Sequence, residues 1–445
     1  MDNNTLSLAI ATGVVGIACT RLLWNSSSNH SLIEWANHLR QRKPHDQATH
    51  WVWQGAAKVT WAWQHGAWGL MVASREAVKE VLTSKRFVKL LDANGTVLDA
   101  TMGNNLLFSD GPDWKLYRHT LSPGFRSLPD ASVILSTVQE MLVAIEKEEV
   151  VDIHPLLQRA AMDCIGKILL DLDLHTVSGG GEFLELFNKV MVEAFDPFYL
   201  AFPWLDSPNN PLRSGIKAHL KELDSFVSGL AASNSGPAAA LMRQADFTEK
   251  QIRDHAMLLL LPSLTTASHA TLILHHLARN PDIQEKARAE IKHVLPLTNE
   301  NINQLPYMNA ILKETLRICP VFAQLPARCT TEDTVIDNTH VPKGTSIVVD
   351  AFTLHRDPEY YPDPLTFNPD RVSGTAPFVG FGGGSRTCVG LNLAKFEVKI
   401  IISMLISNYS ISYPANVTPN LDPEYLPTQL LIPKGVNLVF TKITQ

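Results

Sequence analysis

The spacing of apolar residues predicts helices over most of the chain, above all between residues 74 and 330. Residues 74–82 begin with a serine suited to capping and then place apolar side chains three and four positions apart. The longest helical pattern spans residues 247–280. It opens with Thr248 and Gln251 at the spacing of a capping box and ends at an Asn-Pro pair. At 1.5 Å per residue, one continuous helix here is about 45 Å long, enough to cross a whole domain.

Short strands are predicted on both sides of this helical region. Residues 51–72 mix aromatic, β-branched and polar side chains around glycines, and residues 330–385 are divided by Pro, Gly and Asp. A further helix follows Cys388, and residues 409–445 have the pattern of strands and loops. The chain is therefore predicted to be mainly α with small β sheets, as one domain over residues 51–445.

The N-terminal residues 1–24 differ from the rest. Residues 6–24 are mostly apolar with one charged residue, an arginine, and their length is close to the ~20 residues of a membrane-spanning helix. Lys and Arg follow this stretch but do not precede it, so the positive-inside tendency places the body in the cytoplasm. A cleaved signal peptide or a buried core helix is the alternative, although a signal peptide normally has a positively charged start. We expect a single-pass membrane anchor in contact with lipid, and a polar linker over residues 25–50.

Composition limits the kind of partner and of site. The 445 residues carry 38 Lys and Arg against 44 Asp and Glu, so no strong positive field favours nucleic acid. The five cysteines are odd in number and contain no CxxC pair, which indicates a reducing compartment and no disulfide framework. Cys and His do not cluster with the spacing of zinc ligands.

One cysteine stands in an unusual setting. Cys388 lies in the stretch FGGGSRTCVG, which is rich in glycine and immediately precedes a predicted helix. Glycines let the backbone approach a flat ligand closely, and a helix N-terminus favours a thiolate. Arg386, two residues earlier, can pair with a carboxylate. A flat ligand that carries carboxylates and accepts a thiolate is haem. The alternative is a buried structural cysteine in a turn.

At this stretch the sequence resembles the cytochrome P-450 family, whose haem loop has the pattern FxxGxRxCxG. All fixed positions match: Phe381, Gly384, Arg386, Cys388 and Gly390. The resemblance covers the chain from about residue 51 to its end and implies the P-450 fold with haem b as cofactor. It further implies that Cys388 is the axial iron ligand and that Arg386 meets a haem propionate.

Other motifs of the same family follow the expected order. Glu314 and Arg317 match its ExxR helix, and Arg371 matches the second arginine that joins them in a buried network. Taken alone, Glu314 and Arg317 suit an ordinary surface pair on one helix face. Trp114 and Arg118 match the family's WxxxR, and Arg328 and His355 stand where it often has further cofactor contacts. The resemblance therefore implies that these last four residues also bind propionates.

The distal helix departs from the family pattern, in which a glycine precedes an acid and a threonine that help to deliver protons. Thr265 and Thr266 are present, but Leu264 replaces the acid and Pro262 replaces the glycine. One interpretation is that Pro262 fixes a bend and that Ser263, Thr265, water or substrate relays protons. The other is that the protein avoids conventional oxygen activation. We favour the first because Thr265 is retained, and Thr265 and Thr266 are the expected catalytic residues.

The resemblance also suggests a substrate and a partner. Segments that line the family's pocket are nearly all apolar here, which favours a lipophilic neutral substrate such as a terpenoid, polyketide or steroid. Likeness to membrane-anchored fungal members suggests secondary metabolism and the endoplasmic reticulum membrane.

The chain has no flavin or nicotinamide motif, so electrons are expected from NADPH through a separate flavin reductase. Four cations are candidates for that contact: Lys115, Arg126, Lys395 and Lys399. The predicted activity is that of a monooxygenase. The alternatives are a haem-thiolate isomerase or dehydratase that uses no O2, and a haem-binding protein without catalysis.

Overall fold

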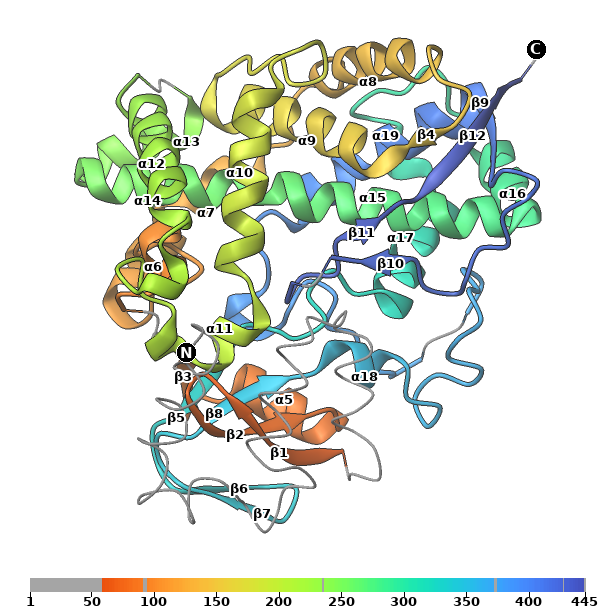
Figure 1. Cartoon of the computed structure of the whole chain (residues 1–445). Coiled ribbons are helices and arrows are strands. Elements are labelled where there is room, and N and C mark those ends of the chain that lie inside the picture. The colour runs from red at the N-terminus through yellow and green to blue at the C-terminus, as the bar shows by residue number, and fades with distance from the viewer. Residues whose placement is uncertain (1–57, 91–93, 234–235, 372–373, 427, 444–445) are drawn as a thin grey trace, which may run out of the picture.

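The computed structural model describes residues 58–90, 94–233, 236–371, 374–426 and 428–443 (Figure 1). The expected anchor and linker lie outside these residues. The α-helices are α5 Arg75–Thr83, α6 Val97–Met102, α7 Gly111–Arg126, α8 Ala131–Ile145, α9 Ile153–Leu170, α10 Gly181–Ala194, α11 Pro197–Ala201, α12 Ile216–Ser233, α13 Pro237–Gln244, α14 Glu249–Leu260, α15 Pro262–Arg279, α16 Pro281–Lys292, α17 Pro306–Ile318, α18 Ala351–His355 and α19 Leu391–Asn408. Four 3₁₀ turns accompany them: η1 Pro203–Leu205, η2 Pro211–Arg213, η3 Ile302–Gln304 and η4 Gly384–Arg386.

The strands are short and form small sheets, as predicted. They are β1 Val59–Gln64, β2 Ala67–Val72, β3 Phe87–Lys89, β4 Val151–Asp152, β5 Arg328–Thr330, β6 Thr334–Ile336, β7 Thr339–Val341, β8 Ser346–Val349, β9 Tyr409–Ser412, β10 Glu424–Tyr425, β11 Pro433–Lys434 and β12 Asn437–Lys442. The largest sheet has the order β1-β2-β8-β5-β3 and lies at one end of the molecule, below the helices in Figure 1. In its β3–β5 pair, Lys89 stands opposite Arg328.

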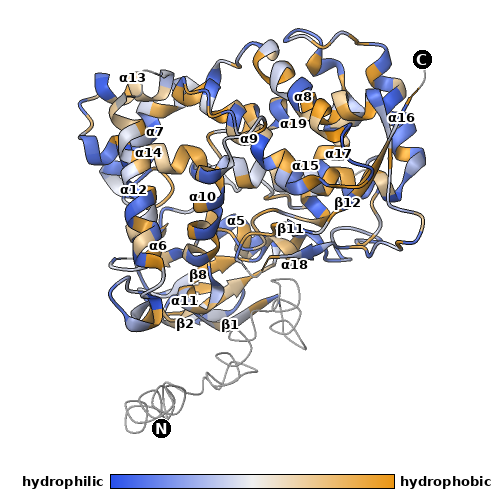
Figure 2. Ribbon diagram, turned by 45° about the horizontal axis from the view of Figure 1, so that its top comes forward, coloured by the Kyte–Doolittle hydropathy of each residue, from blue (hydrophilic) through white to orange (hydrophobic). Residues whose placement is uncertain are grey.

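Helix α15 is the centre of the helical part and packs against α9, α17 and α19. It is buried from Ser263 to Leu277 with Thr265 as the exception, so protein surrounds it on nearly all sides, although it carries several Ser, Thr and His side chains. Figure 2 shows the contrast in hydropathy between α9 and α15 inside and the hydrophilic outer helices α12 and α16. Among the described residues, Glu249–Arg279 is the one straight helical run with the length and composition of a membrane span. Because 83% of its apolar window is buried inside the protein, it is a core helix.

The predicted helix over residues 247–280 is correct at both ends and interrupted in the middle. The capping box of Thr248 and Gln251 is present, and α15 ends at Arg279. The hydrogen bonding breaks at Pro262, which has no N–H to donate. Leu261 N–H donates to Leu258 O over 3.2 Å, and Leu264 N–H donates to Leu261 O over 3.1 Å, both with the tighter 3₁₀ spacing. Leu261 keeps helical angles (φ −57°, ψ −36°), so α14 and α15 continue as one rod.

Candidate functional site

The loop before α19 is shaped by its approach to α5. Gly384 has φ +64°, and a Cβ there would lie 2.2 Å from the carbonyl oxygen of Leu82. Only glycine fits that position without moving the backbone of α5. The loop then folds back so that Cys388 N–H donates to Phe381 O over 3.0 Å. Helix α19 begins at Leu391, directly after its N-cap Gly390, whose carbonyl accepts the N–H of Ala394. The sequence pattern of this loop is therefore a set of steric requirements that fix the position of the Cys388 thiol.

Cys388 faces a large cavity under α14 and α15. The cavity contains about 1630 Å³ of space free of protein atoms, part of it open to solvent, and Cys388, Phe381 and Gly390 contribute to its lining. Cys388 has exposed surface, but that surface faces the cavity and protein surrounds it. Desolvation therefore raises the pKa of the thiol, while the N–H of Gly390 and the charge of Arg118 lower it. A bound metal cation reverses this balance and holds the sulfur as thiolate.

Basic side chains gather at one end of the cavity. Its lining there contains Lys89, Arg118, Arg328, Arg386 and the indole of Trp114. The pKa of Lys89 is lowered by burial and by the positive charges of Arg328 and Arg386, and the pKa of Arg386 is lowered to about 10, mainly by burial. Buried cations that depress one another's pKa favour an anionic ligand, which relieves both the repulsion and the desolvation.

One acid, Asp110, partly balances this group of cations. Arg386 donates through Nη2 to Asp110 Oδ1 over 2.5 Å and through Nη1 to Ser109 O over 2.9 Å. Its guanidinium also lies over the Trp114 ring, 4.1 Å from the centroid. Arg118 donates to Thr387 O over 3.0 Å, next to the cysteine. The cation group is thereby fixed in place but keeps an excess of positive charge.

The cavity as a whole suits a flat group that bears carboxylates at one edge and a metal at its centre. A thiol lies on its floor, cations lie at one end, and the opposite wall is apolar. These features fit haem.

The structure brings Glu314, Arg317 and Arg371 together in the core. Arg317 is bound side-on to Glu314 by two hydrogen bonds of 2.8 Å, and Arg371 Nε donates to Glu314 Oε1 over 3.2 Å. Arg317 also donates through Nη1 to the carbonyls of His355 and Pro364. The Arg317 side chain is 2% exposed and the Glu314 side chain 5%, so this is a buried ion network and no surface pair.

Two predicted cofactor contacts lie outside the cavity lining: Gly384, which packs against Leu82 of α5, and His355. The His355 side chain is fully buried, and Nε2 accepts the N–H of Val379 over 2.9 Å. Its ring stacks on Phe378, with centroids 5.2 Å apart. Burial and the nearby charge of Arg317 lower the pKa of His355 to about 3, so the ring is neutral. His355 does not line the cavity, so the structure does not support the predicted propionate contact. Instead, His355 positions the segment that leads into the cysteine loop.

The wall opposite Cys388 carries few polar groups. Thr265, Thr266 and His269 of α15 line the cavity, while Leu264 is buried in the adjoining hydrophobic core and is not among the lining residues. Ser263 is also outside the lining, because its hydroxyl donates to Leu260 O over 2.8 Å. Ser263 as a proton relay is therefore excluded, and Thr265 and Thr266 remain.

The predicted substrate-lining segments contribute in part. Cavity-lining residues come from the loop before α7, from α14 and α15, and from the segment after α17; they are Leu106, Leu107, Leu258, Leu259, Leu261, Pro262, Val321, Phe322 and Leu325. Two polar residues of the neighbouring segments, Gln324 and Thr428, do not line it: Gln324 contacts Met71, and Thr428 donates to Leu430 O over 2.7 Å.

Lys89, Asp110 and His269 were not among the predicted site residues. Lys89 reaches the cavity because β3 pairs with β5, and this register is not visible in the sequence. Asp110 had a local signal, as an acid that caps the helix carrying Trp114. His269 also had one, since it follows Thr265 by four residues and so shares its helix face. One proposed reductase contact is wrong: Lys399 is buried and donates to Ile302 O over 3.1 Å.

A thiol at the floor of a cation-rimmed cavity, below one long core helix, defines a haem-thiolate protein. Residues 29–440 match the family Cytochrome P450, a span that begins within the expected linker. Over 390 residues the chain is 26% identical to cytochrome P450 3A29 of Sus scrofa, covering 77% of this chain and 76% of that protein. It is 26% identical to cytochrome P450 3A1 of Rattus norvegicus over 395 residues, with 77% and 78% covered. It is 25% identical to the lithocholate 6-beta-hydroxylase of Mesocricetus auratus over 388 residues, with 77% and 76% covered. The chain belongs to the cytochrome P450 family and is a haem-dependent monooxygenase.

Loss of the Glu314 carboxylate is predicted to destabilise the protein strongly. Glu314→Gln leaves Arg317 and Arg371 buried without their counter-charge, which costs about 3–5 kcal/mol. Urea unfolding of the haem-loaded protein, followed by circular dichroism, measures the change. The matched control is Glu285→Gln, which removes the exposed partner of Arg288 and is expected to cost less than about 1 kcal/mol. Equal effects of the two substitutions contradict a supporting role for the buried network.

Proposed function

We propose that this protein oxygenates a neutral lipophilic molecule of the terpenoid, polyketide or similar secondary-metabolite type. The observation that supports this proposal is the composition of the cavity wall formed by α14 and α15. This wall is apolar apart from Thr265, Thr266 and His269. A charged substrate would lose its hydration there without gaining a partner. The basic end of the cavity does not change this argument, because its cations are the proposed partners of the propionates.

The proposed roles follow from position. Cys388 holds the iron; Arg118, Arg328, Arg386, Lys89 and Trp114 bind the propionates; and Phe381, Gly384 and Gly390 shape the loop. Arg317 and Arg371, held by Glu314, support the segment that leads into that loop, through the carbonyls of His355, Pro364 and Thr366. Bound haem supplies the iron at which O2 is reduced and from which one oxygen atom reaches the substrate. Thr265 holds a hydroxyl proton on the reacting side.

A second function, rearrangement or dehydration without O2, is favoured by one observation. Leu264, at the position where the family pattern has an acid, is buried outside the cavity lining and cannot carry a proton. The retained Thr265, whose hydroxyl makes only a long 3.3 Å contact with Pro262 O, supports oxygenation over this alternative.

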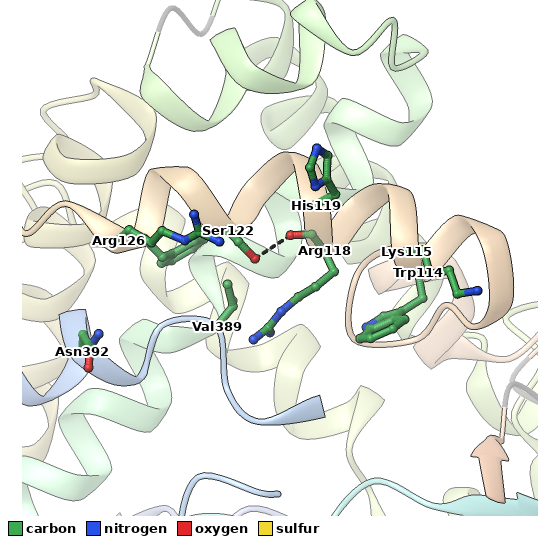
Figure 3. A pocket seen from close by; sticks show the side chains of 9 residues that line it. Trp114, Lys115, Arg118, His119, Ser122, Arg126, Val389 and Asn392 are labelled. Atoms are coloured by element: carbon green, nitrogen blue, oxygen red, sulfur yellow. Dashed lines mark hydrogen bonds between the residues drawn. The ribbon is translucent and has the colours of Figure 1, made fainter. Parts of the chain in front are cut away.

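We propose further that electrons come from NADPH through a separate flavin reductase that docks beside α7. Figure 3 shows the groove there, where Lys115, Arg118 and Arg126 project from α7 above Val389 and Asn392. Trp114, Arg118, Phe125 and Val389 line both this groove and the cavity. One layer of side chains therefore separates a docked partner from the cofactor space, and the cations suit an acidic partner surface.

We also propose that the protein is held at the endoplasmic reticulum membrane by residues 6–24, with its catalytic domain in the cytoplasm. A patch of apolar side chains near the first described strand supports contact with lipid. Trp204 is 59% exposed and Leu212 58%, and Trp204 packs edge-on against Trp63 of β1. Exposed tryptophan at a polar boundary is typical of side chains at the membrane surface.

Product mass separates the two functions. Incubation of the haem-loaded protein with a panel of neutral lipophilic metabolites, NADPH and a reductase is expected to yield a product one oxygen atom heavier than its substrate. With isotopically labelled O2, that atom carries the label. An unlabelled product of unchanged mass, or one lacking a water, supports the second function and contradicts oxygenation.

Charge reversal in the groove tests the docking surface. Lys115→Glu with Arg126→Glu is expected to slow reduction by the reductase at low salt by about tenfold or more, since steering changes association rates by 10–10³. The difference shrinks as salt rises. Lys292→Glu, on the distant helix α16, is the control and leaves the rate unchanged. A double variant reduced at the same rate as the parent protein at low salt rules the proposal out.

A further inference from the structure

His269 is the one histidine among the residues that line the described cavity. It lies on α15, four residues after Thr265 and three after Thr266, so the three side chains share a helix face. Its side chain is 5% exposed, and the small accessible part borders the cavity. A polar ring in this position needs an explanation, because the adjoining lining residues Leu316 and Val398 are apolar.

One ring nitrogen of His269 has a clear structural partner. Nε2 lies 3.0 Å from the carbonyl oxygen of Leu312 on α17. A carbonyl only accepts hydrogen bonds, so Nε2 carries the hydrogen. Burial lowers the pKa of His269 to about 4, opposed by the Leu312 bond and helped by the positive charge of Lys395. At neutral pH the ring is therefore uncharged, and Nδ1 is a bare acceptor.

Nδ1 differs from the free nitrogens of the other buried histidines. Nε2 of His154 and Nε2 of His255 are sealed from solvent without a hydrogen-bond partner, whereas Nδ1 of His269 is not among the sealed atoms. It makes no hydrogen bond with the residues that the structure describes. The acceptor therefore opens into the cavity, where only a molecule held in the cavity can satisfy it.

The geometry of the helix limits what that molecule is. One turn of helix separates His269 from Thr265, a rise of about 5.4 Å, and helical side chains lean toward the N-terminus, which brings the ring over the Thr265 turn. Two hydrogen bonds of about 2.8 Å each, joined by one water, span about the same distance. A buried water with two or more polar partners is an ordinary structural component of proteins.

We propose that His269 is a positioning residue that holds a water against the hydroxyl of Thr265 on the reacting side of the cavity. The water donates one hydrogen to Nδ1 and accepts the hydroxyl hydrogen of Thr265, which otherwise reaches only the 3.3 Å contact with Pro262 O. The imidazole thereby supplies the hydrogen-bond acceptor that the Leu264 side chain lacks, about one helical turn further along α15. The inference rests on the proposed oxygenation at this cavity.

Two amide substitutions separate the cavity-facing nitrogen from the structural one. The amide of His269→Asn occupies the place of Nδ1 and loses the bond to Leu312, whereas His269→Gln keeps a donor near Nε2 and loses the Nδ1 acceptor. The first readout is a crystal structure of each haem-loaded variant. A water within hydrogen-bond distance of Thr265 Oγ is expected in the parent protein and in His269→Asn, and not in His269→Gln.

The second readout is the peroxide released per molecule of NADPH consumed during turnover. It is expected to rise about tenfold in His269→Gln and to stay near the parent value in His269→Asn, a modest part of the 10²–10⁴ that proton delivery contributes. The control is the same pair of substitutions at His154, which is bonded to Thr271 over 3.1 Å and lies outside the cavity. Neither His154 variant is expected to change the water or the peroxide ratio.

The opposite pattern overturns the proposal. If His269→Gln keeps the water and the peroxide ratio while His269→Asn loses stability, the ring serves only to join α15 to α17. Loss of haem from both His269 variants, with both His154 variants intact, leads to the same conclusion. If the parent protein makes no oxygenated product, the proposed function fails, and the water in the crystal structures still decides the role of His269.

Discussion

Placement of the Cys388 sulfur is the constraint on which the rest of the structure depends. The loop that carries it is pressed against Leu82 of α5 at Gly384, where a Cβ would come within 2.2 Å of a backbone oxygen. From the other side it is tied by Arg118 to Thr387 O, and His355 accepts the N–H of Val379 just before it. Each tie ends on backbone atoms of the loop segment, so it fixes the path of the main chain. The buried Arg317 joins these supports, since it donates to the carbonyl of His355.

Electrostatics make the same site incomplete without its cofactor. Burial raises the pKa of the Cys388 thiol, and burial lowers the pKa of Lys89 and of Arg386. Burial thus disfavours the thiolate form of Cys388 and the charged forms of Lys89 and Arg386. An iron porphyrin compensates both, with its metal at the sulfur and its carboxylates at the cations. The unfavourable free energy of burying these groups is offset when haem binds, which favours tight retention of the cofactor.

Local patterns in the sequence were sufficient to predict much of the fold and of the candidate site. Helix caps, the mainly α class and the motifs around Cys388, Glu314 and Trp114 depend on residues close together in the chain. The structure brings the motifs around Cys388 and Trp114 to one cavity and joins Glu314 to Arg317 in the core. The misplaced residues depend on long-range contacts. His355 was assigned to the cofactor from its neighbours, yet its partner is the backbone of Val379; Lys399 was assigned to the surface, yet it reaches Ile302. Lys89 joins the site only through the register of β3 against β5.

Thiolate ligation by Cys388 is the central claim, and the absorption spectrum of the reduced haem protein under carbon monoxide tests it most directly. The parent protein is expected to show the red-shifted band of thiolate-ligated haem, and Cys388→Ser is expected to lose it. Cys329→Ser, which alters a partly exposed cysteine outside the cavity, keeps the band. A thiolate band that persists in Cys388→Ser, or a parent protein that never shows it, contradicts the account.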